Sequence, residues 1–140
     1  MPLVYDDIVR GRSRDRIRAL RDSTQAAIVE AFETPERDRY QLVTEHSPDE
    51  MIIQDHGLGI KRSENRVVIH MHNRRAKSTP SQKEKLYALL VQNLKRDCGL
   101  DRADLVVSIT ENESEDWSVG YGKAQFCKGE LDPVSSQPQK

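Results

Sequence analysis

A strand, a helix and a second strand occur twice in succession along this chain, and this repeat constrains the fold more than any other feature. In the first copy, an apolar run over 3–9 and a β-branched and aromatic run over 40–45 enclose a stretch with helical periodicity. That stretch begins at the N-cap residue Ser13 and continues to about Phe32. A helix between two strands makes the strands parallel, with a right-handed crossover. The first half therefore predicts a βαβ unit.

The second half repeats this plan. Strand-like runs over 67–71 and 104–111 enclose a helical stretch that ends at Gly99. The segment 79–82, Thr-Pro-Ser-Gln, supplies an N-cap, a proline at the first helical position and a capping-box glutamine. Both halves also place an aspartate six residues ahead of a Thr-Glu pair. The chain therefore predicts two βαβ units of similar length.

Together the two units predict an α+β fold, with a four-stranded mixed sheet and two helices on one face. Residues 1–131 are expected to form one domain, because 140 residues suffice for one core only. Segments 117–122 and 124–126 predict a short C-terminal hairpin, and the polar tail over 132–140 is expected to be disordered. Since no third helix covers the other sheet face, subunits are expected to pack their sheets together.

Composition narrows the class of protein. Charged residues make up 32% of the chain, and no apolar run approaches the roughly 18 residues that span a bilayer. A net charge of -1 argues against a dedicated nucleic-acid binder, which needs a basic excess. The amino terminus lacks a signal-peptide pattern, so a cytoplasmic location is expected. The arginines between Arg10 and Arg21 are interpreted as one solvated helix face.

The opening dipeptide, Met1-Pro2, carries candidate chemistry. A small second residue lets the initiator methionine be removed, which would leave Pro2 with a free secondary amine at the start of an apolar strand. An unperturbed α-amine titrates at about 7.7–8. Apolar surroundings would make it a neutral base or nucleophile, whereas a nearby carboxylate would keep it cationic and acidic. Most Met-Pro openings only start an extended segment, so the dipeptide alone leaves these alternatives open.

Internal motifs carry a resemblance to a known family. Five separated segments are similar to malonate semialdehyde decarboxylase of the tautomerase superfamily, in the same order: 35–41, 50–53, 57–65, 103–109 and 116–126. The likeness extends from Pro2 to about Leu131. It implies a homotrimer that decarboxylates a small 3-oxo carboxylate without a metal or organic cofactor.

The resemblance also implies roles for individual residues. Pro2 corresponds to the catalytic amine, Asp38 to its carboxylate partner, and Arg74 to the first of two arginines that hold the substrate carboxylate. The family spacing of the second arginine falls on Ala76, which leaves Arg75 and Lys77 as alternatives. Each of these residues is one position away from Ala76, and a side chain one residue along a strand points to the opposite face, which counts against both as direct replacements. The implied apolar wall consists of Trp117, Val119, Tyr121 and Phe126.

Other functions use the same elements. A neutral proline could instead catalyse tautomerisation of a 2-oxo acid or hydration of an unsaturated acid, and a binding protein could retain the fold without activity. The related cis-3-chloroacrylic acid dehalogenase requires a histidine about where this chain has Val29, which argues against dehalogenation. His70 and His72 share a strand face, but a third ligand at suitable spacing is missing, so no metal site is predicted.

Overall fold

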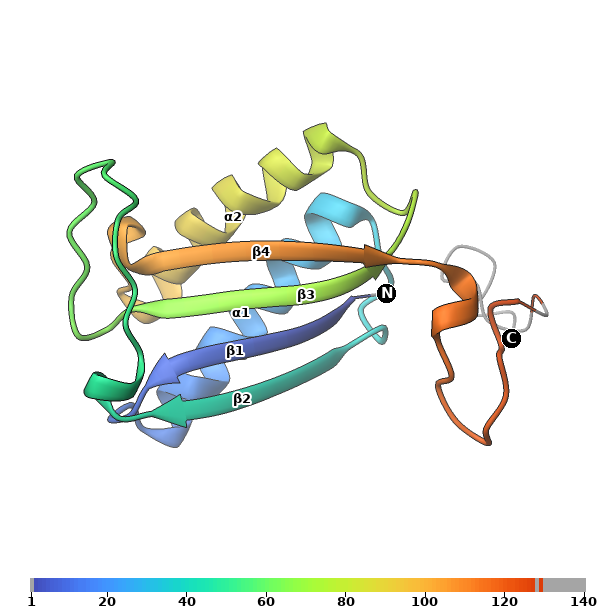
Figure 1. The fold of residues 1–140 in the computed structure, drawn as a ribbon, viewed down its shortest axis with the longest axis horizontal. Helices are drawn as coiled ribbons and strands as arrows, with labels where there is room; N and C mark the ends of the chain where they lie inside the picture. The colour runs from blue at the N-terminus through green and yellow to red at the C-terminus, as the bar shows by residue number, and fades with distance from the viewer. Residues whose placement is uncertain (1, 128, 130–140) are drawn as a thin grey trace.

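The computed structural model, which describes residues 2–127 and 129, contains two strand–helix–strand units that share one sheet (Figure 1). The first unit consists of β1 (Leu3–Val9), α1 (Arg14–Phe32) and β2 (Tyr40–His46), and the second of β3 (Val67–Arg74), α2 (Pro80–Cys98) and β4 (Leu105–Asn112). The sheet order is β2-β1-β3-β4. Both helices lie behind the same sheet face in Figure 1. The predicted fold class and the order of its elements are therefore confirmed.

The two units meet through their first strands. β1 pairs parallel with β2, and β3 pairs parallel with β4, while β1 and β3 run antiparallel. The register places Leu3 opposite Tyr40 on one side and opposite His72 on the other. The beginning of β1 consequently lies at the sheet end where the arrows of β3 and β4 terminate (Figure 1). This antiparallel junction gathers segments from all four strands at one place.

Both helix starts are capped by the residues that the sequence indicates. The Ser13 side chain accepts a hydrogen bond from the backbone N–H of Arg16, which satisfies a free donor of the first turn. Thr79 and Gln82 form a complete capping box at the start of α2. Gly99 ends that helix in the left-handed region, at φ 67°, which glycine adopts without a Cβ clash.

The hydrophobic core lies between the helices and one sheet face. Alternate strand residues and one stripe of each helix are fully buried there, among them Val4, Ile8, Ile28, Ile69, Met71, Leu86, Leu90 and Leu94. The opposite sheet face stays open to solvent. On it Tyr40 and Leu42 of β2 expose 40% and 51% of their surfaces. None of the helices in the described part of the chain is long and apolar enough to cross a membrane.

The C-terminal segment differs from the prediction. No strand forms between residues 117 and 127, so the expected hairpin is wrong. Gly120, Tyr121 and Gly122 all have positive φ angles, which turns the backbone out of the extended conformation that strand pairing requires. The Gln125 side chain holds this turn, accepting from the Val119 N–H at 3.1 Å and donating to the Gly120 carbonyl at 2.7 Å. The predicted tail over 132–140 lies outside the described residues.

A buried carboxyl group lies within the core. Asp6 of β1 is 1% exposed, and neither of its carboxylate oxygens has a hydrogen-bond partner among the residues described. Burial, reinforced by the neighbouring charge of Asp7, raises the pKa of Asp6 from 3.8 to about 7, while Arg21 opposes this change. Asp6 is therefore largely protonated in the folded protein at mildly acidic pH.

Replacing Asp6 with asparagine is expected to stabilise the protein at pH 8 and to have little effect near pH 4. Between an unfolded-state pKa of about 3.9 and a folded-state pKa of about 7, unfolding releases a proton, so wild-type stability falls as pH rises. An asparagine side chain does not ionise and therefore avoids this loss. Allowing for the cost of burying its amide, we expect the free energy of unfolding at pH 8 to increase by about 1–3 kcal/mol. Urea unfolding at both pH values measures the difference.

The exposed Asp22, whose side chain is 59% accessible, provides the control substitution Asp22→Asn. It should leave the pH dependence of stability unchanged, because a surface ion pair contributes at most about 1 kcal/mol. An Asp6→Asn protein with the same decline in stability between pH 4 and pH 8 as the wild type would contradict the assignment of that decline to Asp6.

Candidate active site

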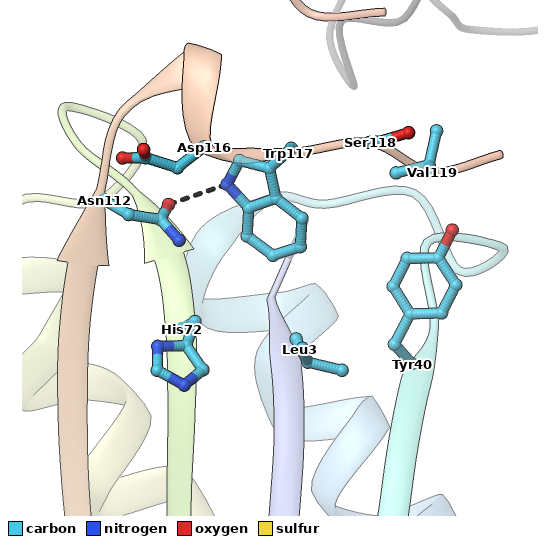
Figure 2. A pocket seen from close by; sticks show the side chains of 8 residues that line it. All are labelled: Leu3, Tyr40, His72, Asn112, Asp116, Trp117, Ser118 and Val119. Carbon is cyan, nitrogen blue, oxygen red and sulfur yellow. Dashed lines mark hydrogen bonds between the residues drawn. The ribbon is translucent and has the colours of Figure 1, made fainter. Parts of the chain in front are cut away.

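A hollow of about 530 Å³ opens at the sheet end where β1 begins and β3 and β4 terminate. Its walls come from the starts of β1 and β2, the ends of β3 and β4, and the segment that follows β4 (Figure 2). The lining residues are Leu3, Tyr40, His72, Asn112, Asp116, Trp117, Ser118 and Val119. Trp117 and Val119 of the predicted apolar wall are thus part of this hollow.

Strand pairing explains why these side chains meet. Leu3, Tyr40 and His72 are register partners on three neighbouring strands, so their side chains stand on the same open face. The Trp117 indole lies over this end of the sheet, and its Nε1–H donates to Asn112 Oδ1 at 2.6 Å (Figure 2). A hydrogen-bonded indole at this position covers the strand ends with apolar surface.

Arg74, the last residue of β3, lies next to this hollow. It is only 3% exposed, its Nη1–H donates to Ser114 Oγ at 3.3 Å, and its Cζ lies 4.0 Å from the centroid of the Phe126 ring. The Phe126 ring in turn meets Trp117 edge-on, with centroids 6.2 Å apart. A guanidinium stays charged even when it is buried. The stack therefore holds a fixed positive charge behind the apolar wall.

Pro2 and Asp38 belong to the same end of the sheet. Pro2 is buried and directly precedes Leu3, while Asp38 stands two residues before Tyr40, the register partner of Leu3. Gln25 of α1 fixes the approach to β2, because its Nε2–H donates to the carbonyl of Asp38 at 3.4 Å. Asp38 Oδ2 is buried and has no hydrogen-bond partner in the part of the chain that the structure describes. Pro2, Asp38 and Arg74 thus lie toward the same end of the sheet.

Two of the remaining sequence candidates lie elsewhere. The Arg75 side chain is 59% exposed and forms ion pairs with Glu113, at 2.5 Å, and with Glu111, at 3.6 Å. Tyr121 is 96% exposed, at φ 59° between two glycines of positive φ, and is not among the residues that line the hollow. Lys77 is half-buried in the turn that follows β3, where its N–H donates to the Arg74 carbonyl at 3.2 Å.

Comparison with known proteins identifies the family. The family model described as "tautomerase enzyme" matches residues 38–120. Over 132 residues, 94% of this chain and all of the relative, the sequence is 45% identical to the probable tautomerase YrdN of Bacillus subtilis (strain 168). The chain belongs to the tautomerase superfamily.

Two solved structures place this tautomerase-superfamily chain more narrowly. Malonate semialdehyde decarboxylase, studied in wild-type, proline-to-alanine mutant and inactivated forms for its decarboxylase and hydratase activities, is 40% identical, with a TM-score of 0.89 over 93% of this chain and 99% of that one. FG41 malonate semialdehyde decarboxylase inhibited by 3-bromopropiolate is 38% identical, with a TM-score of 0.87 over 92% of this chain and 97% of that one. The resemblance to this group is therefore confirmed.

Several residues that line the hollow were not predicted from the sequence as site residues. Tyr40, Asn112 and Ser118 line it, and so does His72, which was considered only as a metal ligand. The alternation of side chains along a strand offered one signal, because His72 lies two positions before Arg74 and must therefore point to the same face of the sheet. Asn112 is the register partner of Arg74, but that pairing joins residues 38 positions apart and leaves no local pattern. The described residues contain no group of three potential ligands that could hold a metal ion.

Proposed function

We propose that this tautomerase-superfamily chain decarboxylates a small 3-oxo carboxylate such as malonate semialdehyde, with Pro2 acting as a free amine after removal of Met1. The observation that carries the proposal is the placement of Pro2, Asp38 and the buried Arg74 at one sheet end, beside an apolar wall. The 40% identity to malonate semialdehyde decarboxylase supports the same reaction.

The chemistry follows from the charge changes of decarboxylation. As the bond from C2 to the carboxylate carbon breaks, its electron pair moves toward the neighbouring carbonyl, carbon dioxide leaves, and C2 takes up a proton. A cationic Pro2 would stabilise the developing enolate by hydrogen bonding to its oxygen, and a neutral Pro2 could act instead through a Schiff base. The negative charge of Asp38 favours the cationic form.

The two ends of the substrate require different surroundings. Arg74 offers a planar fork that holds the carboxylate in one orientation. Trp117 and Phe126 surround this position with apolar surface, which favours a carboxylate that loses its charge over one that keeps it. Lys77 is the remaining candidate for a second cation, because Glu113 and Glu111 hold Arg75 at the surface.

Tautomerisation or hydration is the second candidate function. The relative that is 45% identical is named a probable tautomerase, and the 40% identical solved structure is associated with hydratase as well as decarboxylase activity. These reactions on 2-oxo or unsaturated acids need the same carboxylate-binding arginine. Keto-enol conversion would use a neutral Pro2 as a base, so the protonation state of Pro2 separates it from the proposed decarboxylation.

A direct assay distinguishes the two candidates. The intact mass of the purified protein is first measured to establish that Met1 is absent. Malonate semialdehyde is then supplied and carbon dioxide release followed, in parallel with ketonisation of phenylenolpyruvate. The proposal expects release of carbon dioxide with a higher kcat/KM than ketonisation. Rapid ketonisation without carbon dioxide release would favour the tautomerase instead, and a retained Met1 would contradict both.

We also propose that the chain works as a homotrimer. The open sheet face exposes Leu42 and Tyr40 beside the candidate site, and burying such apolar surface against other subunits is favourable. Native mass spectrometry should then detect an assembly of three 16.0 kDa chains, whereas a monomer at micromolar concentration would contradict the proposal.

A further inference from the structure

We propose that Asn73 is a positioning residue for Pro2: its side-chain carbonyl accepts one N–H of the free proline ammonium and keeps the ring nitrogen in place. This inference rests on the proposed function, in which Pro2 is the reacting amine. It adds a neutral amide oxygen to the predicted pair of Pro2 and Asp38.

Strand register places Asn73 beside Pro2. Leu3 and His72 are the last paired residues of β1 and β3 at this sheet end, and their side chains share the open face. Continuing this register by one step, beyond the last printed strand residue of β1, sets Pro2 opposite Asn73 and turns both side chains to the other, helix-side face. Directly opposite residues have Cβ atoms about 4.5–5.5 Å apart and point to the same face. A short asparagine side chain can therefore reach the proline nitrogen.

The Asn73 side chain is buried and only partly hydrogen-bonded. Asn73 is 1% exposed, and its Nδ2–H donates to Ser78 Oγ at 3.3 Å. Its Oδ1 is buried and has no hydrogen-bond partner within residues 2–127 and 129. Buried amide oxygens are nearly always hydrogen-bonded in folded proteins, so an orphaned one beside a reactive group needs an explanation.

Removal of Met1 creates the donors that this end of the sheet lacks. While Met1 is attached, the Pro2 nitrogen is a tertiary amide without hydrogen. The free ammonium of Pro2 carries two N–H groups. Two buried side-chain acceptors in its neighbourhood have no donor among the described residues: Asn73 Oδ1 on the β3 side and Asp38 Oδ2 on the β2 side. The two donors gained therefore match these two acceptors in number.

This arrangement assigns different tasks to the two acceptors. Asp38 attracts the cation by charge. Without substrate, Asp38 accepts one N–H of Pro2, and when substrate binds this N–H can donate to the substrate carbonyl instead. Asn73 keeps the other N–H throughout and so maintains the direction of the ring nitrogen. The ammonium donates a stronger, charge-assisted hydrogen bond to Oδ1 than the neutral amine does, so Asn73 also favours the cationic form.

The test measures Pro2 itself. Protein labelled with ¹⁵N-proline is titrated by NMR without substrate, and the Pro2 amine signal gives its pKa directly. In Asn73→Leu, which has similar volume and no acceptor, the ionisation constant of Pro2 is expected to rise about tenfold, a decrease of its pKa by about one unit. In Asn73→Asp, which keeps the shape and adds a negative charge, the pKa of Pro2 is expected to increase.

Asn93 of α2 supplies the matched control. It is a buried asparagine, 6% exposed, on an element that does not line the hollow, so Asn93→Leu should leave the Pro2 titration unchanged. If Asn73→Leu does not fold, as judged by circular dichroism, Asn73→Asp and Asn73→Ser carry the test. A Pro2 titration that is the same in the wild type and in the folded Asn73 variants would overturn the inference.

Activity separates this inference from the proposed function. With the preferred substrate, Asn73→Leu is expected to lower kcat about tenfold or more and to leave KM within about twofold, because Asn73 orients the amine and does not hold the carboxylate. A Pro2 titration that depends on Asn73 in a protein without decarboxylase activity would remove the proposed function and leave the positioning role. Decarboxylase activity together with a Pro2 titration that does not change in the Asn73 variants would keep the proposed function and remove the positioning role.

Discussion

Replacement of Pro2 by alanine is expected to lower kcat/KM for the 3-oxo acid by about 10²- to 10⁴-fold, the usual contribution of one positioned acid or base. Alanine still permits removal of Met1 and leaves a primary amine, but it lacks the ring that ties the nitrogen to the side chain and so fixes its orientation. The buried position of Pro2 at the start of β1 makes this restriction effective. Steady-state kinetics on proteins of verified intact mass measure the loss.

A second variant isolates the amine from the ring. An uncleaved glycine placed before Pro2 keeps the proline and converts its nitrogen to an amide, so activity should fall to background. Circular dichroism should show both proteins folded, because Pro2 precedes the first hydrogen-bonded residue of β1. Turnover by Pro2→Ala equal to that of the wild type would exclude Pro2 from the reaction, and background rates for both proteins would favour a binding protein on the same fold.

Replacement of Arg74 by alanine is the second large effect expected. Removing a buried guanidinium from its anionic ligand costs about 2–5 kcal/mol, which corresponds to a decrease in kcat/KM of about 30- to 5000-fold, seen mainly as a higher KM. Arg74→Lys should recover part of the loss, since lysine keeps the charge but has neither the planar fork nor the stacking on Phe126. Initial rates over a range of substrate concentrations give both constants.

The adjacent Arg75 is a matched control for this substitution. Its side chain is 59% exposed and paired with Glu113 and Glu111, and exposed pairs contribute at most about 1 kcal/mol. Arg75→Ala should therefore stay within about threefold of the wild-type kcat/KM. A larger loss for Arg75→Ala than for Arg74→Ala would show that the substrate carboxylate is held on the other side of the turn.

Local patterns predicted most of the secondary structure because they report on contacts between near neighbours. The caps at Ser13 and Thr79 and the stop at Gly99 were all confirmed, since a helix end depends on side chains within one turn. The C-terminal hairpin was wrong for a related reason. Aromatic and β-branched residues over 117–122 favour strands, but the positive φ angles around Tyr121 and the Gln125 hydrogen bonds form a turn instead.

The candidate site likewise combines residues that the sequence predicted with contacts that only the fold shows. Pro2, Asp38 and Arg74 were proposed from motifs, and the fold places all three at one sheet end. The spacing could not decide whether Arg75 or Lys77 is the better candidate for the second cation. That choice depends on the ion pairs of Arg75 with Glu111 of β4 and with Glu113, which follows β4. The orphaned Asn73 oxygen and the buried Asp6 carboxyl likewise become visible only when the neighbours of each atom are known.

By itself, the sequence determined that this chain would form two βαβ units, with a proline directly before the first strand. Hydrophobic periodicity and capping residues act over a few positions, so they can be recognised without a partner segment. Only the tertiary structure decided that β1 runs antiparallel to β3, which pairs Leu3 with His72 although 69 positions separate them. That pairing depends on how two helices pack on one sheet face, a balance of contacts across the whole core that no local pattern records.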